Sequence, residues 1–266
     1  MIVIGEKINS SLKSIRPAME ARDKHATKEL ARLQRDAGAS YIDVNAGMFY
    51  ENEEETLQWL IESIQEVVDL PFAIDSPNVD AIRAGLLANK NGKPIVNSIT
   101  GESKRFETVL PIIKEFDTAV IALCMDDTGM PESAEDRVRI ARKLIHDLTQ
   151  AGIAMDDIFI DPLVRPIGTG SHYGKVALET IRIVKSEFPE VHIACGLSNV
   201  SFGIPARKLI NQTFLIAAMS VGMDGAILDP LDKKLMSFLH AGEALLGLDD
   251  YCMNFISKFR DGEIEI

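Results

Sequence analysis

The feature that most constrains this sequence is a repeat of strand-length apolar runs, separated by longer stretches with a helical pattern. Most of these runs are continuously hydrophobic, as expected of parallel strands that are buried on both faces. The predicted strands are 2–8, 40–47, 71–77, 94–100, 119–126, 158–163, 192–199 and 225–230. Repeated strand–helix units are typical of an α/β fold built around a parallel sheet.

The segments between these runs place apolar residues at helical spacing against a charged face. The predicted helices are 17–37, 53–68, 78–89, 105–116, 133–151, 175–188, 207–221 and 233–246, with a last one near 250–260. Both ends of the helix at 133–151 are visible in the sequence. Ser133 is its predicted N-cap, Asp136 follows three residues later, and Gly152 lies just beyond its end.

Eight strand–helix units favour a (β/α)₈ barrel that forms a single domain over residues 1–266. A doubly wound open sheet is the alternative. We prefer the barrel because the units number eight and because no glycine-rich turn follows the first strand, as it does in dinucleotide-binding sheets.

The composition excludes several classes of partner. A formal net charge of −12 argues against binding to a nucleic-acid backbone, which requires a basic face. No apolar run reaches the roughly 18 residues of a membrane span, and the first ten residues lack the basic segment of a signal peptide. The three cysteines, Cys124, Cys195 and Cys252, do not suggest a disulfide framework. We therefore expect a cytoplasmic protein with no membrane or nucleic-acid partner.

Polar residues lie at the carboxyl-terminal end of every predicted strand. They are Glu6, Asp43, Asn45, Asp75, Ser76, Asn97, Ser98, Asp126, Asp161, Ser198, Asn199 and Asp229. In a barrel these ends converge on one mouth, where barrel enzymes have their active sites. Any one of these residues could instead cap a helix or form an Asx turn.

The predicted mouth is rich in carboxylates and amides, and no Lys or Arg ends a predicted strand. The histidines and cysteines lack metal-binding spacing, so no metal site is predicted. The glycine-rich loop at 166–174 could bind an anion, but a flexible loop over the mouth is the preferred interpretation. Carboxylate and amide groups suit a neutral heterocycle with several N–H donors, such as a pterin or a purine.

Several short segments carry a family resemblance in their order and spacing. They are GEKIN (5–9), DVNAG (43–47), IDSPN (74–78), NS (97–98), IDPL (160–163) and GLSNVS (196–201). Together they resemble the pterin-binding family. Within it they are most similar to the methyltetrahydrofolate:corrinoid/iron–sulfur protein methyltransferases and related enzymes. The resemblance implies a (β/α)₈ barrel, usually a homodimer, that binds tetrahydrofolate or 5-methyltetrahydrofolate as its substrate.

The resemblance also implies roles for individual residues. Asp75, Asn97 and Asp161 are expected to hydrogen-bond the pterin ring. Asn199 is expected near N5, the nitrogen that carries the methyl group, and is the main candidate for catalysis. Asp75 is a second catalytic candidate.

Other positions are expected around the substrate. Gly196 and Ser198 would line the pocket, and Arg207 would lie near the aminobenzoate–glutamate tail. Phe202 departs from the family pattern, which has a polar residue there. The loop at 166–174 also departs from the pattern.

The implied reaction moves a methyl group between N5 of tetrahydrofolate and the cobalt of a corrinoid, in a direction that the sequence leaves open. The cobalamin is expected on a separate corrinoid protein, because the chain is too short for a barrel plus a corrinoid domain. One alternative is a dihydropteroate synthase-like reaction, for which a Lys is expected after the strand-seven serine. Here Asn199 and Val200 follow Ser198. Another alternative is a non-catalytic folate-binding subunit.

Overall fold

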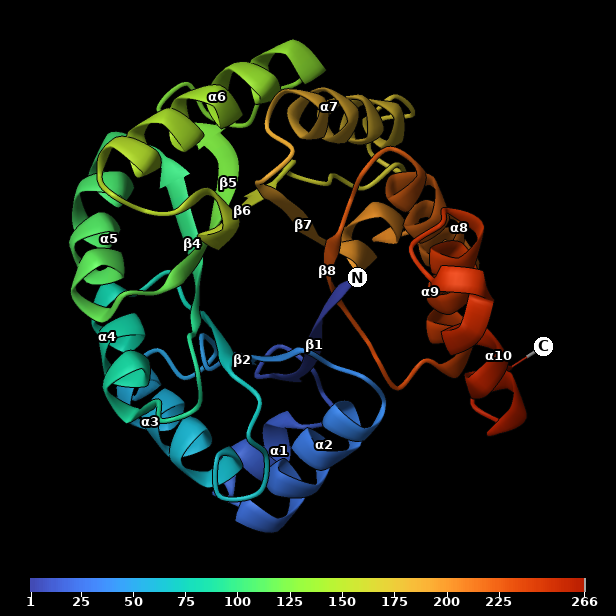
Figure 1. Ribbon diagram of the computed structural model, residues 1–266. Helices are drawn as coiled ribbons and strands as arrows, with labels where there is room; N and C mark the ends of the chain where they lie inside the picture. Colours follow the sequence, from blue (N-terminus) through green and yellow to red (C-terminus); the bar gives the residue numbers. More distant parts are fainter. Residues whose placement is uncertain (266) are drawn as a thin grey trace.

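The computed structural model describes residues 1–265, and these form a closed barrel of eight parallel strands in sequence order. The strands are β1 (Ile2–Asn9), β2 (Tyr41–Asn45), β3 (Phe72–Asp75), β4 (Ile95–Gly101), β5 (Ala119–Asp126), β6 (Ile158–Asp161), β7 (His192–Gly196) and β8 (Gly225–Leu228). Pairing between β1 and β8 closes the ring, which Figure 1 shows encircled by helices. The predicted barrel is confirmed, and the open sheet is excluded.

Helices return the chain from one strand to the next. They are α1 (Arg16–Glu20), α2 (Lys24–Asp36), α3 (Glu53–Ile64), α4 (Val79–Ala88), α5 (Ser103–Phe116), α6 (Ala134–Gln150), α7 (Tyr173–Glu187), α8 (Arg207–Ser220), α9 (Lys233–Leu245) and α10 (Met253–Arg260). The predicted start of α6 is confirmed: the Asp136 backbone N–H donates to Ser133 Oγ at 3.1 Å. Gly152, just beyond its end, has a φ of +94°.

The single helix predicted for 17–37 is wrong, because the chain breaks between α1 and α2. Arg22 has a left-handed φ of 51°, which interrupts the helical path. Asp23 then starts a new helix by accepting hydrogen bonds from the backbone N–H groups of His25 and Ala26. An N-cap aspartate accepts hydrogen bonds from backbone N–H groups that have no partner within the first turn of a helix. These hydrogen bonds stabilise a new helix start at Asp23 relative to one continuous helix.

The strand predicted for 192–199 is also too long. Strand β7 ends at Gly196, and the 3₁₀ helix η2 (Leu197–Ser201) follows at once. Asn199 therefore lies on a tight helical turn above the barrel and not on a strand. The short 3₁₀ helix η1 (Met155–Asp157) was not predicted, and the helix predicted near 250–260 consists of the 3₁₀ helix η3 (Asp250–Cys252) followed by α10.

Apolar side chains form two separate layers. The larger layer lies between the strands and the surrounding helices and includes Leu57, Leu60 and Val120. A smaller cluster fills the inside of the barrel. Its buried members are Ile4, Ala73, Ile95, Ala119, Ile121, Phe159 and Ala194. This interior plug closes the barrel from below, so a hollow can form only above it, at the carboxyl ends of the strands.

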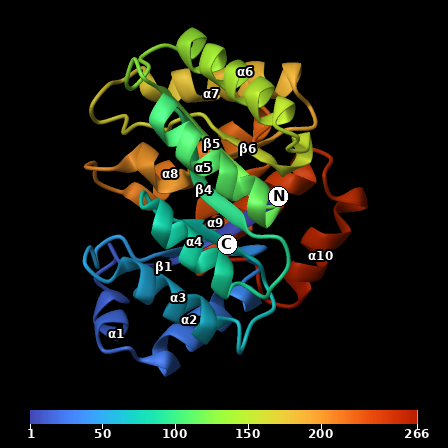
Figure 2. The same cartoon turned by 90° about the vertical axis from the view of Figure 1, so that its left-hand side faces the viewer.

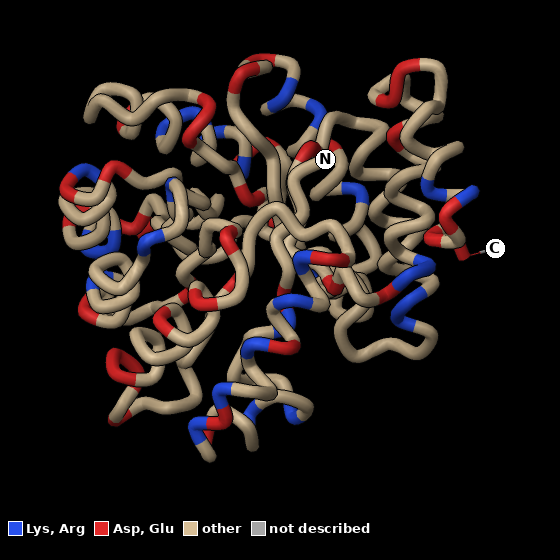
Figure 3. Tube along the Cα trace, turned by 60° about the horizontal axis from the view of Figure 1, so that its bottom comes forward, with Lys and Arg blue, Asp and Glu red and all other residues tan. Residues whose placement is uncertain are grey.

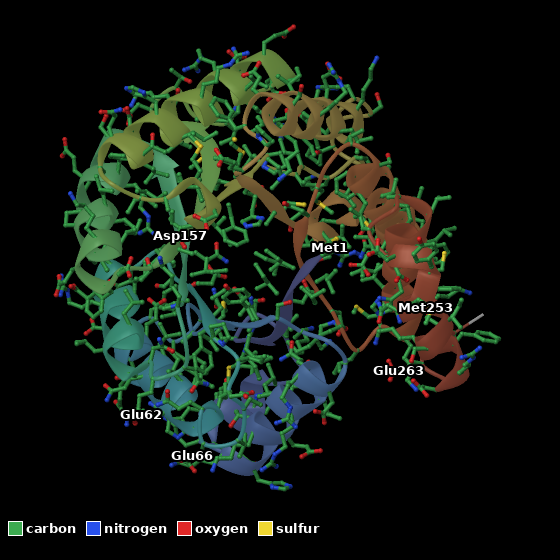
Figure 4. The ribbon with its side chains drawn as sticks, in the orientation of Figure 1. Met1, Glu62, Glu66, Asp157, Met253 and Glu263 are labelled. Carbon is green, nitrogen blue, oxygen red and sulfur yellow. The ribbon has the colours of Figure 1, made fainter. Side chains whose placement is uncertain are left out.

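The two ends of the barrel are distinct in the figures. Figure 2 shows the barrel from the side, with α1 and α8 on the left and the amino terminus and α10 on the right. Figure 4 shows Met1 near the centre of the ring and Met253 on its outer edge. The Met1 ammonium group pairs with Glu243 at 2.5 Å, which fixes the chain start beside α9.

A fully buried arginine holds two loops at the mouth. Arg137 on α6 has no exposed surface. Its guanidinium group donates to the Pro162 carbonyl at 2.9 Å and to the Pro131 carbonyl at 3.4 Å. The loop that follows β6 is thus tied to the loop that precedes α6.

We predict that Arg137→Leu lowers the free energy of unfolding by about 2–4 kcal/mol, because it leaves buried carbonyl groups without donors and reshapes a packed site. Chemical denaturation measures this loss. Arg142→Leu is the matched control on the same helix: Arg142 is 53% exposed and pairs with Glu187 on the surface. It should cost no more than about 1 kcal/mol. Equal losses for the two variants would contradict the structural role given to Arg137.

Candidate functional site

The polar residues of the site stand one layer above the interior plug. Alternate residues of a strand share one face, so a plug residue and the residue two places later both point into the barrel. Four strands follow this rule with an apolar residue below and a polar residue above. The pairs are Ile4 and Glu6, Ala73 and Asp75, Ile95 and Asn97, and Phe159 and Asp161.

These polar residues line a cavity of about 400 Å³ at the mouth, which we call the polar cavity. It brings together six of the predicted site residues: Asp75, Asn97, Asp161, Gly196, Ser198 and Asn199. Its wall also contains Asp43 and Glu6, which the sequence placed at strand ends without a role. Apolar lining residues such as Leu12 and Leu163 were not predicted, because nothing in their sequence context distinguishes them from core residues.

A network of side chains fixes the carboxylates of β2 and β3. Asn45 Nδ2 donates to Asp75 Oδ2 at 2.9 Å, while Asn45 Oδ1 accepts from Ser10 Oγ at 3.0 Å. Asn97 Nδ2 donates to Asp43 Oδ1 at 3.2 Å. The asparagines at strand ends thus serve partly to orient the neighbouring acids, and a fixed orientation is what a binding carboxylate needs.

Burial changes the protonation of the acids in the polar cavity. Desolvation raises the pKa of Asp161 to about 7, although the Leu163 backbone N–H and Arg137 oppose the shift. Desolvation and the nearby Asp229 raise the pKa of Glu6 to about 7. Burial raises the pKa of Asp75 to about 6, and burial and the neighbouring Asp75 also raise the pKa of Asp43 well above its ordinary value. The site can therefore hold protons near neutral pH.

Asn199 is held above the cavity by its neighbours on η2. A Cβ atom at Gly196 would lie 3.1 Å from Asn199 Nδ2, so the absence of a side chain there makes room for the amide. The Asn199 backbone carbonyl accepts from the Phe202 N–H at 3.2 Å. Gly196 is therefore the residue that lets the Asn199 side chain lie across the end of β7.

Arg207 does not line the polar cavity, and its side chain holds η2 in place. Its guanidinium group donates to the Ser198 carbonyl at 2.7 Å and to Ser201 Oγ at 3.0 Å. The same group stacks over Phe202, 5.7 Å from the ring centre. The structure thus gives Arg207 a positioning contact that the sequence did not predict, and its place near the tail stays a prediction.

The predicted absence of cations at the strand ends needs correction. Lys7, in the last third of β1, reaches over the mouth and pairs with Asp229 at 2.8 Å. Together with Arg207 it lowers the pKa of Glu6 against the effect of burial and Asp229. The sequence did not predict this contact. Lys7 follows the inward-facing Glu6, so alternation along β1 predicts that its side chain points away from the mouth.

Three predicted strand-end residues have structural roles instead. Asp126 accepts from the Thr128 backbone N–H at 3.0 Å and pairs with Arg139. Ser76 Oγ accepts from the Asn78 backbone N–H at 2.9 Å and donates to Glu53 at 2.6 Å. Asp229, besides holding Lys7, accepts from the Leu231 N–H at 3.0 Å. For these residues the turn-forming interpretation holds.

The glycine-rich loop at 166–174 does not line the polar cavity. It is tied down by the Ile167 N–H, which donates to the Val200 carbonyl at 3.0 Å. At its ends, Arg165 and Tyr173 both bind Glu132. The loop therefore supports η2 from the side.

Within the described residues 1–265, neither a metal-binding cluster nor a membrane-spanning helix is found. No group of three His, Cys, Asp or Glu residues within 1–265 has a geometry that could hold a metal ion. Likewise, no helix in these residues combines the length and the apolar character that a bilayer crossing requires.

Residues 5–229 match the family described as "Pterin binding enzyme". The chain therefore belongs to the pterin-binding enzyme family, as its sequence segments predicted. It is 37% identical to the methylcorrinoid:tetrahydrofolate methyltransferase of Eubacterium limosum, over 99% of this chain and 98% of the relative.

Other relatives share part of their length or only their fold. The methionine synthases of Mycobacterium leprae and Mycobacterium tuberculosis are 31% and 32% identical over 85% of this chain, which spans 20% of each of those proteins. The dihydropteroate synthase of Yersinia pestis superposes with a TM-score of 0.69 over 92% of both chains, at 17% identity. The last comparison shows a common fold.

We predict that Asp161→Asn changes how stability depends on pH. The pKa of Asp161 is about 7 in the folded protein against an ordinary value of 3.8. Between these values the unfolded chain releases the proton more readily, so this group lowers the free energy of unfolding as pH rises. A neutral Asn removes that loss. The difference in Tm between variant and wild type should therefore shift in favour of the variant from about pH 5 to about pH 8.

Scanning calorimetry of the protein without ligand measures this trend. Asp156→Asn, at an exposed position of η1, is the control and should give a constant difference. A constant difference for Asp161→Asn as well would contradict the raised pKa.

Proposed function

We propose that this protein catalyses methyl transfer between N5 of tetrahydrofolate and the cobalt of a separate corrinoid protein. The single observation that carries the proposal is the polar cavity, which unites Asp75, Asn97 and Asp161 with Asn199. The near full-length similarity to a methylcorrinoid:tetrahydrofolate methyltransferase supports it. The same pocket serves both directions of transfer, and the thermodynamics of the partner set which one prevails.

The cavity suits the pterin ring in its chemistry. A pterin edge offers adjacent N–H donors, which one carboxylate can accept in a bidentate manner. Asp161 lines the cavity, and the Leu163 N–H at 2.8 Å uses only part of the hydrogen-bonding capacity of its carboxyl group. An amide such as Asn97 both donates and accepts, as the mixed atoms of the ring require. We assign Asp75, Asn97 and Asp161 to the pterin ring on this basis.

Asn199 is assigned to N5. In transfer away from folate, the bond between N5 and the methyl carbon breaks and its electron pair stays on N5, which is a poor leaving group until it is protonated or hydrogen-bonded. An amide N–H aimed at N5 stabilises the charge that develops there in the transition state. The corrinoid supplies a cobalt centre that accepts or donates the methyl group.

Glu6, with a pKa of about 7 in the same cavity, holds a proton that can reach N5 through water. In the reverse direction the N5 lone pair forms the bond and the proton returns to the site. We assign Asp75 to catalysis together with Glu6. The hydrogen bond that Asn45 donates to Asp75 fixes the position of the Asp75 carboxylate beside the ring.

The alternative reactions receive less support. A dihydropteroate synthase-like condensation must stabilise a departing pyrophosphate, and the position after Ser198 holds the neutral Asn199. Similarity to dihydropteroate synthase rests on the fold, at 17% identity. A folate-binding subunit without activity would need no amide placed over the cavity by Gly196.

We predict that one variant affects mainly the rate of methyl transfer and another mainly the affinity for folate. Asn199→Ala should lower the rate of methyl transfer about 10²-fold, since one donor to the developing charge is lost, with less than about a tenfold change in folate Kd. Asp161→Asn should raise the folate Kd by about tenfold or more, because a donor amide then faces the ring N–H groups.

Single-turnover assays in both directions, with free cobalamin and with candidate corrinoid proteins, measure the rate. Fluorescence titration measures the Kd. A wild-type rate for Asn199→Ala would remove its catalytic role. Tight folate binding with no transfer in either direction would favour the folate-binding subunit.

A protein partner must bring its cobalt to the mouth, and exposed apolar residues lie on the loops there. Met48 and Tyr50 follow β2, Met130 follows β5, and Phe202 follows β7 and η2; Phe202 is 66% exposed. Exposed aromatic side chains near a functional opening are typical of docking surfaces. We assign Phe202 to contact with the corrinoid protein.

Phe202→Ala should raise the KM for the corrinoid protein about tenfold while it changes the rate with free cobalamin by less than about twofold. The partner loses a contact, whereas Arg207 keeps its hydrogen bonds to Ser198 and Ser201. Steady-state assays with each acceptor measure the difference. Phe259→Ala on α10, which is 55% exposed on the far side, is the matched control and should leave both values unchanged. An equal loss with free cobalamin would place Phe202 in the folate site instead.

A further inference from the structure

Arg105 is the third residue of α5, and its partly buried side chain lies at the mouth of the barrel. On the outer helices, Lys and Arg residues are interspersed with Asp and Glu (Figure 3). Arg83, for example, forms an ion pair with Glu115 there. The guanidinium group of Arg105 instead donates hydrogen bonds to backbone carbonyl groups.

Four hydrogen bonds join Arg105 to the chain at two neighbouring strands. Nη2 donates to the Ser76 carbonyl at 2.9 Å, and Nη1 donates to the Pro77 carbonyl at 2.6 Å. Nε and Nη2 both donate to the Ser98 carbonyl, at 3.0 Å and 2.7 Å. Ser76 and Pro77 follow β3, and Ser98 lies in β4. A single side chain therefore links β3 and β4 at the mouth.

The carbonyl groups that Arg105 binds lie next to two residues of the polar cavity. Asp75 directly precedes Ser76, and Asn97 directly precedes Ser98. The pairing of β3 with β4 ends at Asp75 and Asn97, so Arg105 continues the connection just beyond this pair. A planar guanidinium group donates in fixed directions. Arg105 thus helps to set the spacing between the Asp75 and Asn97 side chains.

Arg105 also acts on the charge of Asp75. Burial raises the pKa of Asp75 to about 6; of its charged neighbours, Glu53 on α3 raises it further and Arg105 lowers it. Asp43 on β2 interacts with Asp75, and Glu102 interacts with Arg105. Among these four neighbours, the three acids disfavour the charged form of Asp75 or offset the effect of the arginine, and Arg105 favours that form.

We infer that Arg105 is a positioning residue for the pterin site. It holds the Asp75 carboxylate and the Asn97 amide at the spacing that the ring edge requires, and its charge keeps Asp75 available as an acceptor. Arg105 does not line the polar cavity, so it acts through these two residues. The inference rests on the proposed function, because it takes the pterin ring as the ligand of Asp75 and Asn97.

Two variants separate the charge of Arg105 from its hydrogen bonds. Arg105→Gln removes both, whereas Arg105→Lys keeps the charge but lacks the planar set of donors. NMR titration of isotopically labelled aspartate follows Asp75 in the protein without ligand, and Asp75→Asn identifies its signal. In Arg105→Gln the Asp75 midpoint should lie above the wild-type value of about 6. In Arg105→Lys it should stay at the wild-type value.

The Kd for tetrahydrofolate is the second readout. It should rise about tenfold in Arg105→Gln at about pH 6.5, because Asp75 is then more often protonated and the spacing to Asn97 is no longer fixed. The ratio of variant to wild-type Kd should fall toward about pH 8.5, where Asp75 is ionised in both proteins. Arg105→Lys should show a smaller loss that does not depend on pH.

Arg83→Gln is the matched control. Arg83 links α4 to α5 through two hydrogen bonds to Glu115, at 2.7 Å and 2.8 Å, on the outer surface. This variant should leave the Asp75 midpoint and the Kd unchanged. A merely structural role for Arg105 would lower the Tm of Arg105→Gln and leave both readouts at their wild-type values, which would overturn the inference. Should Arg105→Gln not fold, a wild-type Kd for Arg105→Lys would overturn it equally.

Neither readout depends on methyl transfer, which separates this inference from the proposed function. The titration uses the protein without ligand, and the Kd measurement contains no corrinoid. If both readouts change as expected but no methyl group is transferred, the proposed function fails and the positioning role holds. If the wild type transfers the methyl group but Arg105→Gln keeps the wild-type midpoint and Kd, the inference fails alone.

Discussion

The site depends on one constraint, which is the apolar plug inside the barrel. Ile4, Ala73, Ile95 and Phe159 fill the lower half of the interior, so the next inward residue on each strand stands on a dry floor. Burial on this floor keeps Asp161 and Glu6 from ionising at their usual pH. If the plug were hydrated, burial would raise the pKa values of these acids less.

The chemistry of the mouth follows from that dry floor. Several acidic side chains surround the centre of the cavity, and they favour a neutral ring with N–H donors over an anionic group. The basic side chains stand further out, at Lys7, Arg207 and the first turn of α9. The gradient from acids at the centre to cations at the side matches a substrate with a neutral head and an anionic tail.

Much of the fold was predictable because it rests on local signals. The strand runs, the Ser133 cap and the position of Asp75 and Asp161 at strand ends are set by periodicity over a few residues. The break at Arg22 and Asp23 was missed, since the apolar pattern continues across it and only the backbone turns. The η2 turn was missed because "GLSN" continues an extended pattern in sequence. Whether the protein is a cytoplasmic homodimer stays a prediction.

The sequence by itself determined the barrel, the end at which the polar residues gather and the family. These follow from strand periodicity and from the order of short segments. Only the tertiary structure decided which polar residues share a cavity. Asp75, Asp161 and Asn199 converge there, while Asp126 and Ser76 turn away to satisfy backbone and helix partners. The reason is physical: burial and side-chain direction are set by closure of the ring, which brings together strands far apart in the chain.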